Sequence, residues 1–221
     1  MRPAPAPSPL PPAFREPDAG ELGRRCIGLL ALQGDYEAHA RAFAEIGAPT
    51  RTVTLPAHLQ EIDSLVLPGG ESTTLNKLLD AYGFRPALAE FQRSGKPLFG
   101  TCAGLILLAR EIVGYPEQAR LGFIDLSVER NAFGRQVESF ETLLEAPALG
   151  PEPLPAVFIR APRIVRLGPE VEPLARLGEE CVLARQGSVL VASFHPELTA
   201  DRRVQRLFLS MGRPREARLA A

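Results

Sequence analysis

The sequence predicts an α/β protein built on a largely parallel β-sheet with helices on both faces and an antiparallel extension. In the first half, continuous apolar runs alternate with stretches whose apolar residues recur at helical spacing. That order is typical of buried parallel strands joined by crossover helices. Beyond residue 113 the chain changes to short alternating or β-branched runs separated by turns, which favours antiparallel strands.

Composition limits the classes of function. The chain has 221 residues, 45% hydrophobic and 23% charged, which fits one globular domain. A net charge of -1 gives no electrostatic reason to expect nucleic acid or an anionic membrane as partner. No apolar run approaches the ~20 residues that span a bilayer. Three cysteines cannot all pair, and their spacing predicts no metal site, so we expect a reduced, cytoplasmic thiol protein.

Three segments are expected along the chain. Residues 1–24 are rich in proline and alanine and predict a disordered tail, because such a segment buries little apolar surface. Residues 25–211 form the predicted domain. Residues 212–221 are a C-terminal tail whose arginines are expected to be solvated.

The first elements alternate between strand and helix. The apolar run at residues 25–32 predicts a strand buried on both faces. Asp35 is expected to cap a helix that continues to residue 46. Residues 50–55 and 63–67 predict the next two strands.

A glycine-containing loop, residues 68–74, follows the third strand. Two glycines at a strand end let backbone amides approach a ligand closely. The loop is either a simple connection or a source of amides that stabilise an oxyanion, and it lacks the spacing of a phosphate-binding loop. Ser72 or Thr73 is expected to cap the following helix, and a second helix is expected over residues 86–93.

Residues 97–108 combine an apolar run, a Gly-x-Cys-x-Gly turn and an apolar helical pattern. This is the layout of a nucleophile elbow, with Cys102 in place of serine. The first helix amides, from Ala103 on, would favour the thiolate over the thiol. The alternative is a buried cysteine on an ordinary strand-to-helix turn.

The second half predicts an antiparallel section and a C-terminal helix over residues 201–211. Its expected strands are residues 122–128, 156–160, 163–167, 181–185 and 188–194. A polar loop with two arginines, residues 129–136, lies between the first two. Cys26 and Cys181 lie in strand-like runs and are interpreted as core residues.

The last strand ends at His195, and Glu197 follows two residues later. A nucleophilic thiol needs a base, and the base needs an orienting carboxylate, so these two residues are candidates for both roles. His39, on the first helix, is interpreted as a surface or otherwise satisfied side chain, and His58 as a loop residue. Because ligands bind at the carboxyl ends of parallel strands, we expect the Gly69–Gly70 pair and Cys102 to share one site.

Six stretches resemble the class I (triad) glutamine amidotransferases, and within them the glutaminase subunits of pyridoxal 5'-phosphate synthase. The stretches are residues 31–35, 68–74, 100–109, 129–136, 158–162 and 195–199. The resemblance covers roughly residues 25–211 and implies a flavodoxin-like, three-layer fold.

The resemblance implies hydrolysis of L-glutamine to L-glutamate and ammonia. Cys102 would form a glutamyl thioester, His195 would act as base and then acid, and Glu197 would orient His195. Positions that match the family's glutamine-binding residues are Gly70, Glu71, Ser72, Arg130, Ile159 and Arg160. The oxyanion-hole candidates are the amide of Ala103 and one amide from Gly69 or Gly70.

It also implies that ammonia passes to a (β/α)8-barrel synthase subunit in a hetero-oligomer, which builds pyridoxal 5'-phosphate. No metal or organic cofactor is expected in this subunit, since the vitamin is a product of the partner. We expect the partner to complete the oxyanion hole and to contact residues 33–35. Rival interpretations are a glutaminase of another pathway, another cysteine hydrolase or isomerase on a similar scaffold, and a non-catalytic scaffold subunit.

Overall fold

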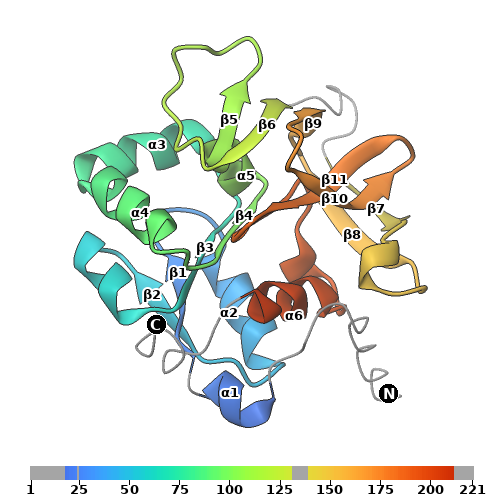
Figure 1. The fold of residues 1–221 in the computed structure, drawn as a ribbon, viewed down its shortest axis with the longest axis horizontal. Helices are drawn as coiled ribbons and strands as arrows, with labels where there is room; N and C mark the ends of the chain where they lie inside the picture. Colours follow the sequence, from blue (N-terminus) through green and yellow to red (C-terminus); the bar gives the residue numbers. More distant parts are fainter. Residues whose placement is uncertain (1–17, 24, 131–138, 212–221) are drawn as a thin grey trace.

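The computed structural model describes residues 18–23, 25–130 and 139–211, and its centre is a seven-stranded sheet (Figure 1). The strand order is β10-β11-β12-β4-β3-β1-β2. These strands are β1 (Ile27–Leu30), β2 (Thr50–Val53), β3 (Ser64–Leu67), β4 (Leu98–Thr101), β10 (Glu172–Leu177), β11 (Glu180–Gln186) and β12 (Val189–Ala192).

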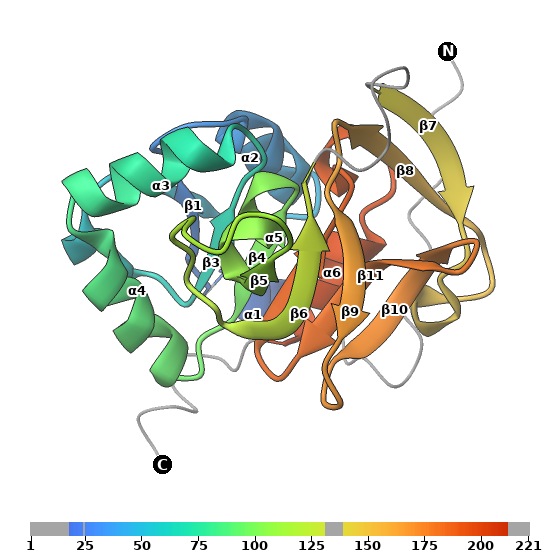
Figure 2. The ribbon, with the colours of Figure 1, turned by 90° about the horizontal axis from the view of Figure 1, so that it is seen from above.

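Five neighbouring strands, from β12 to β2, run parallel, and β11 and β10 extend the sheet antiparallel. The expected α/β fold is therefore confirmed. Helices cover the sheet in two layers (Figures 1 and 2). They are α2 (Tyr36–Ala44), α3 (Ser72–Ala81), α4 (Phe84–Arg93), α5 (Ala103–Leu108) and α6 (Arg203–Ser210).

Each face of the sheet has its own apolar core. Leu65, Leu67 and Leu98 pack on the side of α3, α4 and α5, whereas Val66 and Phe99 pack on the side of α2 and α6. Alternate residues of one strand thus enter opposite cores, because successive strand side chains point to opposite faces. Burying each large apolar side chain contributes about 1.5–3 kcal/mol, which is why these strands are apolar throughout.

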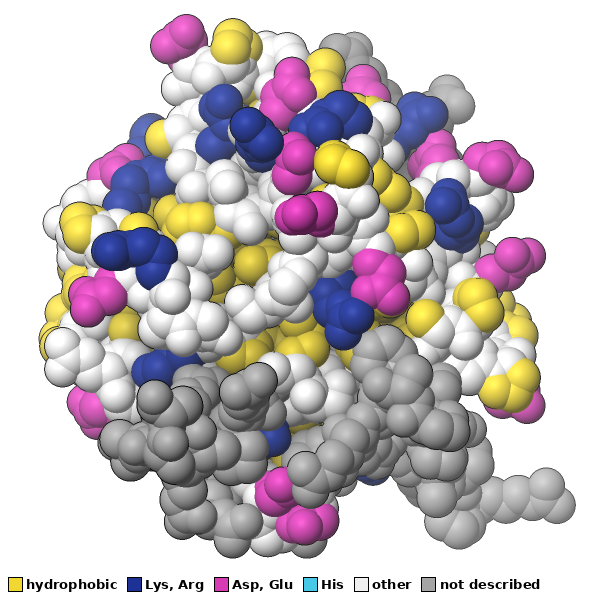
Figure 3. Space-filling model, viewed as in Figure 1, with side chains coloured by type: hydrophobic (Ala, Val, Ile, Leu, Met, Phe, Trp, Pro, Cys, Tyr) yellow, Lys and Arg dark blue, Asp and Glu magenta, His cyan; other side chains and the backbone are white. Residues whose placement is uncertain are grey.

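Two smaller sheets flank the central one (Figure 2). The first joins β5 (Ala109–Ile112), β6 (Ile124–Glu129) and β9 (Arg163–Leu167), and the second is the hairpin of β7 (Ser139–Leu144) and β8 (Leu154–Ile159). The short 3-10 helices are η1 (Pro56–Glu61), η2 (Pro147–Leu149) and η3 (Pro196–Leu198). On the face in Figure 3, acidic and basic side chains are interspersed.

The expected antiparallel section differs from the structure in two ways. The last strand, β12, belongs to the parallel core, where it pairs with β4. Strands β5, β7 and β10 were not predicted. Strand β5 was missed because it follows α5 directly after Leu108. The spacing of apolar residues does not show where the helix ends and the strand begins in such a continuous apolar run.

Several expected boundaries also change. A short helix, α1 (Ala19–Gly23), occupies part of the predicted tail, so that assignment is wrong for residues 19–23. Helix α3 is capped by Glu71, whose carboxylate accepts from the amides of Thr73 and Thr74, and neither Ser72 nor Thr73 is the cap. Helix α4 begins at Phe84, two residues early, and the His58 segment is the 3-10 helix η1.

The remaining tail assignments, residues 1–17, 24 and 212–221, lie outside the described residues, as do residues 131–136 of the polar loop. Among the helices that the structure describes, none combines the length and apolarity needed to cross a membrane.

Candidate active site

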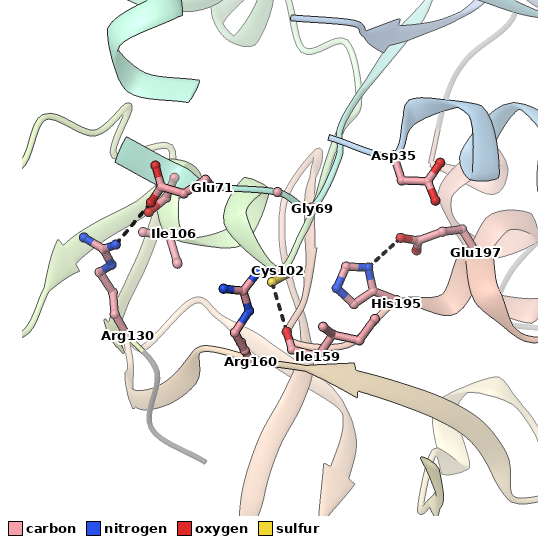
Figure 4. A pocket seen from close by; sticks show the side chains of 12 residues that line it. Asp35, Gly69, Glu71, Cys102, Ile106, Arg130, Ile159, Arg160, His195 and Glu197 are labelled. Carbon is pink, nitrogen blue, oxygen red and sulfur yellow. Dashed lines mark hydrogen bonds and ion pairs between the residues drawn. The ribbon is translucent and has the colours of Figure 1, made fainter. Parts of the chain in front are cut away.

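Three adjacent strands bring the candidate residues together. In the sheet β4 lies between β12 and β3, and all three run parallel. Their carboxyl ends therefore share one edge, where β3 leads to Gly69, β4 to Cys102 and β12 to His195. Figure 4 shows these segments converging on one cavity. The expectation that the glycine pair and Cys102 share a site is met.

Cys102 occupies a strained turn. Its φ of 48° and ψ of -102° are costly for a residue with a side chain, by about 1–3 kcal/mol. The turn is held by the amide of Cys102, which donates to the carbonyl of Ala192 over 2.9 Å. A Cβ on Gly104 would lie 2.1 Å from the carbonyl oxygen of Leu67, so only glycine lets α5 pack this closely on β3.

The thiol of Cys102 is largely enclosed, with 8% of the residue exposed. Its Sγ lies 3.8 Å from the carbonyl oxygen of Ile159 at the end of β8. In the same cavity wall, a Cβ on Gly69 would lie 2.4 Å from Cε1 of His195 and 3.4 Å from Cβ of Cys102. Gly69 is therefore fitted between the nucleophile candidate and the histidine.

His195 and Glu197 form a close buried pair. Nδ1 of His195 lies 2.7 Å from Oε1 of Glu197. Burial alone would lower the pKa of His195, but hydrogen bonds with Cys102 and Glu197, together with their charges, raise it to about 10. Burial would likewise raise the pKa of Glu197, yet His39 and the hydrogen bond with His195 keep it below its ordinary value. The site therefore favours an imidazolium against a carboxylate.

The sequence did not reveal His39 as part of the site, and its interpretation as a surface residue is wrong. Its side chain is fully buried, and Nε2 lies 3.4 Å from Oε1 of Glu197. The sequence signal is weak, because His39 and Glu197 are far apart in the chain and one histidine on a helix has many ordinary explanations.

The loop after β3 is held by residues 33 and 34. The side-chain oxygen of Gln33 accepts from the amide of Glu71 over 3.0 Å. Gly34, with φ of +98°, passes so close to the carbonyl of Gly69 that a Cβ there would lie 1.9 Å from that oxygen. The predicted oxyanion and partner-contact segments are thus in direct contact.

Two arginines reach the cavity from different sheets (Figure 4). Arg130, just after β6, pairs with Glu71 at 3.6 Å and lies over the ring of Tyr115, 5.0 Å from its centroid. Arg160, just after β8, is exposed and has a φ of 43°. Both guanidinium groups are suited to bind a carboxylate.

The cavity encloses about 330 Å³, enough for a small substrate. Its lining includes Gly69, Gly70, Glu71, Ser72, Cys102, Arg130, Ile159, Arg160, His195 and Glu197, together with Asp35 and Ile106, which the sequence did not indicate. Ala103 starts the helix directly after the nucleophile candidate. Within the described ranges, no group of three or more His, Cys, Asp or Glu side chains is placed to hold a metal.

The fold and this arrangement define an α/β protein whose cavity gathers a cysteine, a histidine and a glutamate at the carboxyl ends of adjacent parallel strands. Residues 29–213 match the SNO glutamine amidotransferase family, and the chain belongs to that family.

Relatives that resemble this chain over most of its length carry the name pyridoxal 5'-phosphate synthase subunit PdxT. The one from Pelotomaculum thermopropionicum is 56% identical over 183 residues, 83% of this chain and 93% of that protein. The one from Thermus thermophilus is 54% identical, covering 85% of this chain and 98% of that protein.

Solved structures agree with this fold. A crystal structure described as a glutamine amidotransferase has a TM-score of 0.80 and 53% identity, covering 84% of this chain and 97% of that one. The structure of PurLQS from Thermotoga maritima has a TM-score of 0.60 at 17% identity, covering 84% of this chain and 95% of that one. At that identity the second likeness supports the fold alone.

Proposed function

We propose that this chain hydrolyses L-glutamine to L-glutamate and ammonia, as the glutaminase subunit of a pyridoxal 5'-phosphate synthase. The observation that carries the proposal is the convergence of Cys102 with the His195–Glu197 pair in one cavity that two arginines also enter. Membership of the glutamine amidotransferase family and the names of the relatives support the substrate and the pathway.

The chemistry follows from the three side chains. The Cys102 thiolate attacks the side-chain amide carbon of glutamine, and the C–N bond breaks as His195 gives its proton to the departing ammonia. This leaves a glutamyl thioester on Cys102. His195 then takes a proton from water, which attacks the thioester and releases glutamate. Glu197 holds the imidazole through Nδ1, so that Nε2 serves the reaction.

The cavity supplies groups for the amino acid end of glutamine. We assign the substrate carboxylate to the guanidinium of Arg130 or Arg160, which can donate two parallel hydrogen bonds. Glu71 pairs with Arg130 and caps α3, so it fixes the loop that contributes Gly70 and Ser72 to the cavity. Ile159 contributes a backbone carbonyl beside the thiol.

The oxyanion hole is assigned to the amide of Ala103 and one amide of Gly69 or Gly70. Two donors aimed at the developing charge lower the barrier more than any single contact. Because the loop is tied to the Gln33–Gly34 turn, a partner that docks on that turn would move the loop. We propose that the synthase partner binds there, and that ammonia passes directly to it.

The test is glutamate release from L-glutamine by the purified chain, with and without the cognate synthase subunit. We expect release to rise with the partner and to vanish in Cys102→Ala. Release that survives Cys102→Ala would overturn the nucleophile assignment, and full activity without a partner would overturn partner activation. Partner binding without turnover would favour a scaffold subunit. Equal stimulation by the synthase subunit of another amidotransferase would favour a different pathway.

A further inference from the structure

His39 lies buried behind the carboxylate of the candidate triad, and the proposed reaction leaves it without a role. It projects from α2, and none of its surface is exposed. Its Nε2 lies 3.2 Å from Oγ1 of Thr101, the residue before the nucleophile, and 3.4 Å from Oε1 of Glu197. Oε1 is the same oxygen that faces Nδ1 of His195 at 2.7 Å. Two imidazole rings therefore share one carboxylate oxygen.

The surroundings select one tautomer of His39. Within the described residues, Nδ1 is buried without a hydrogen-bond partner. A proton on Nδ1 would leave a buried donor unpaired and would turn the lone pair of Nε2 towards the carboxylate oxygen. A proton on Nε2 instead forms the hydrogen bond with the hydroxyl oxygen of Thr101, lies beside Oε1 of Glu197 and leaves only an acceptor unpaired, which is the less costly arrangement.

The charged groups around His39 keep the ring neutral. Burial, reinforced by the charge of His195, lowers the pKa of His39 and outweighs the opposing influence of Glu197 and of Asp35 at the start of α2. Glu197, His195 and Asp35 are the charged groups that shift the pKa of His39. A neutral ring with a hydrogen on Nε2 presents a fixed partial positive charge to Glu197.

We propose that His39 is a positioning residue, whose Nε2–H takes up part of the negative charge on Oε1 of Glu197 and so limits how tightly Glu197 holds the protonated His195. The inference rests on the proposed function, in which His195 must release a proton to the departing ammonia. A carboxylate contacted by a single donor would hold the imidazolium more strongly, and proton release would be slower. The hydroxyl oxygen of Thr101 competes with Glu197 for the same hydrogen.

The first experiment compares His39→Leu with His39→Gln in the complex with the synthase subunit. Leucine removes the donor, whereas the amide nitrogen of glutamine can replace Nε2. The titration midpoint of His195 is followed by NMR of ¹³Cε1-labelled histidine, which is tractable because the chain has only three histidines. Glutamine turnover gives kcat and KM on the same samples.

We expect His39→Leu to raise the midpoint of His195 by about half a pH unit or more and to lower kcat about threefold to tenfold, with KM nearly unchanged. His39→Gln should restore both values. A midpoint that stays in place or falls would overturn the proposal. A glutamine variant as impaired as the leucine variant would overturn it as well, because the replaced donor would then have no effect. The control is His58→Gln, on η1, which should match the unsubstituted chain.

Two further measurements do not depend on the folding of the leucine variant. The ¹⁵N shifts of His39 in the unsubstituted chain should show a neutral ring protonated on Nε2, and a charged ring or an Nδ1 proton would overturn the proposal. Thr101→Val removes the competing acceptor and should lower the midpoint of His195, opposite to His39→Leu. The ¹⁵N shifts and the His195 midpoint are both measured without turnover. A chain inactive on glutamine would therefore refute the proposed function, while these two measurements would still test the proposed role of His39.

Discussion

Replacing Glu197 with glutamine removes one negative charge from the His195 pair and keeps an oxygen that can accept from Nδ1. The ordinary pKa of histidine here is 6.5, and the site raises that of His195 to about 10. At about 1.4 kcal/mol per pH unit, the folded site favours the imidazolium by about 5 kcal/mol, shared between Cys102 and Glu197. A carboxylate about 4 Å from the charge centre supplies about 4 kcal/mol at an effective dielectric constant near 20.

Glu197→Gln should therefore lower the midpoint of His195 by about one to three pH units. The sign follows from the charge: without the anion the imidazolium is less stable, so it loses its proton at lower pH. We expect kcat for glutamine hydrolysis to fall by about 10²–10⁴-fold.

The assay is the NMR titration of His195 together with glutamate release at several pH values. A midpoint that remains near 10 with turnover intact would refute the reasoning, because Glu197 would then contribute neither charge nor orientation. Glu172→Gln is the matched control. It removes a carboxylate that pairs with Arg185 on the outermost strands of the sheet and should leave His195 unchanged.

Three more predictions concern packing and substrate binding. Gly104→Ala places a Cβ 2.1 Å from the carbonyl oxygen of Leu67 and should destabilise the fold by about 1–3 kcal/mol in urea unfolding, with loss of turnover as the elbow shifts. Arg203→Leu leaves Asp201 and three backbone carbonyls without their buried partner and should cost about 3–5 kcal/mol in the same assay. Arg130→Lys should raise KM for glutamine about tenfold with a smaller change in kcat, because lysine cannot donate two parallel hydrogen bonds.

Each of these has its own control. In Gly23→Ala the new Cβ meets nothing within 4 Å, so the urea midpoint should stay unchanged. A loss of stability equal to that of Gly104→Ala would mean that the contact with β3 is not the cause. Arg51→Leu removes an exposed partner of Glu61, and an effect as large as that of Arg203→Leu would contradict the importance of burial. An unchanged KM in Arg130→Lys would place the substrate carboxylate elsewhere.

Local sequence patterns were enough to predict much of the fold and to name the candidate site residues. Apolar runs marked β1, β3, β4 and β12, because strands buried on both faces must be apolar throughout. The two glycines around Cys102 marked the elbow, since a tight strand-to-helix turn excludes larger residues. His195 and Glu197 could be named as a candidate base and its carboxylate because both side chains follow the same strand end.

Other boundaries depended on competition that a short window does not contain. The carboxylate of Glu71 accepts from two amides at the start of α3 and also pairs with Arg130. The sequence alone could not show that Glu71, and not Ser72 or Thr73, would be the cap. By sequence pattern alone, strand β12 groups with the short antiparallel runs that precede it. Its parallel pairing with β4 shows that it belongs to the parallel core.

The sequence by itself determined the α/β class and the candidates for nucleophile and base, because each depends on neighbouring residues with local steric or chemical requirements. Only the tertiary structure decided that Arg130 meets Glu71 and that His39 stands behind Glu197. Those contacts join segments far apart in the chain, and they exist because parallel strands align their carboxyl ends at one edge while α2 packs its inner face beneath it. Long-range contacts of this kind leave no spacing in the sequence, so the electrostatic environment of the site is a property of the folded chain.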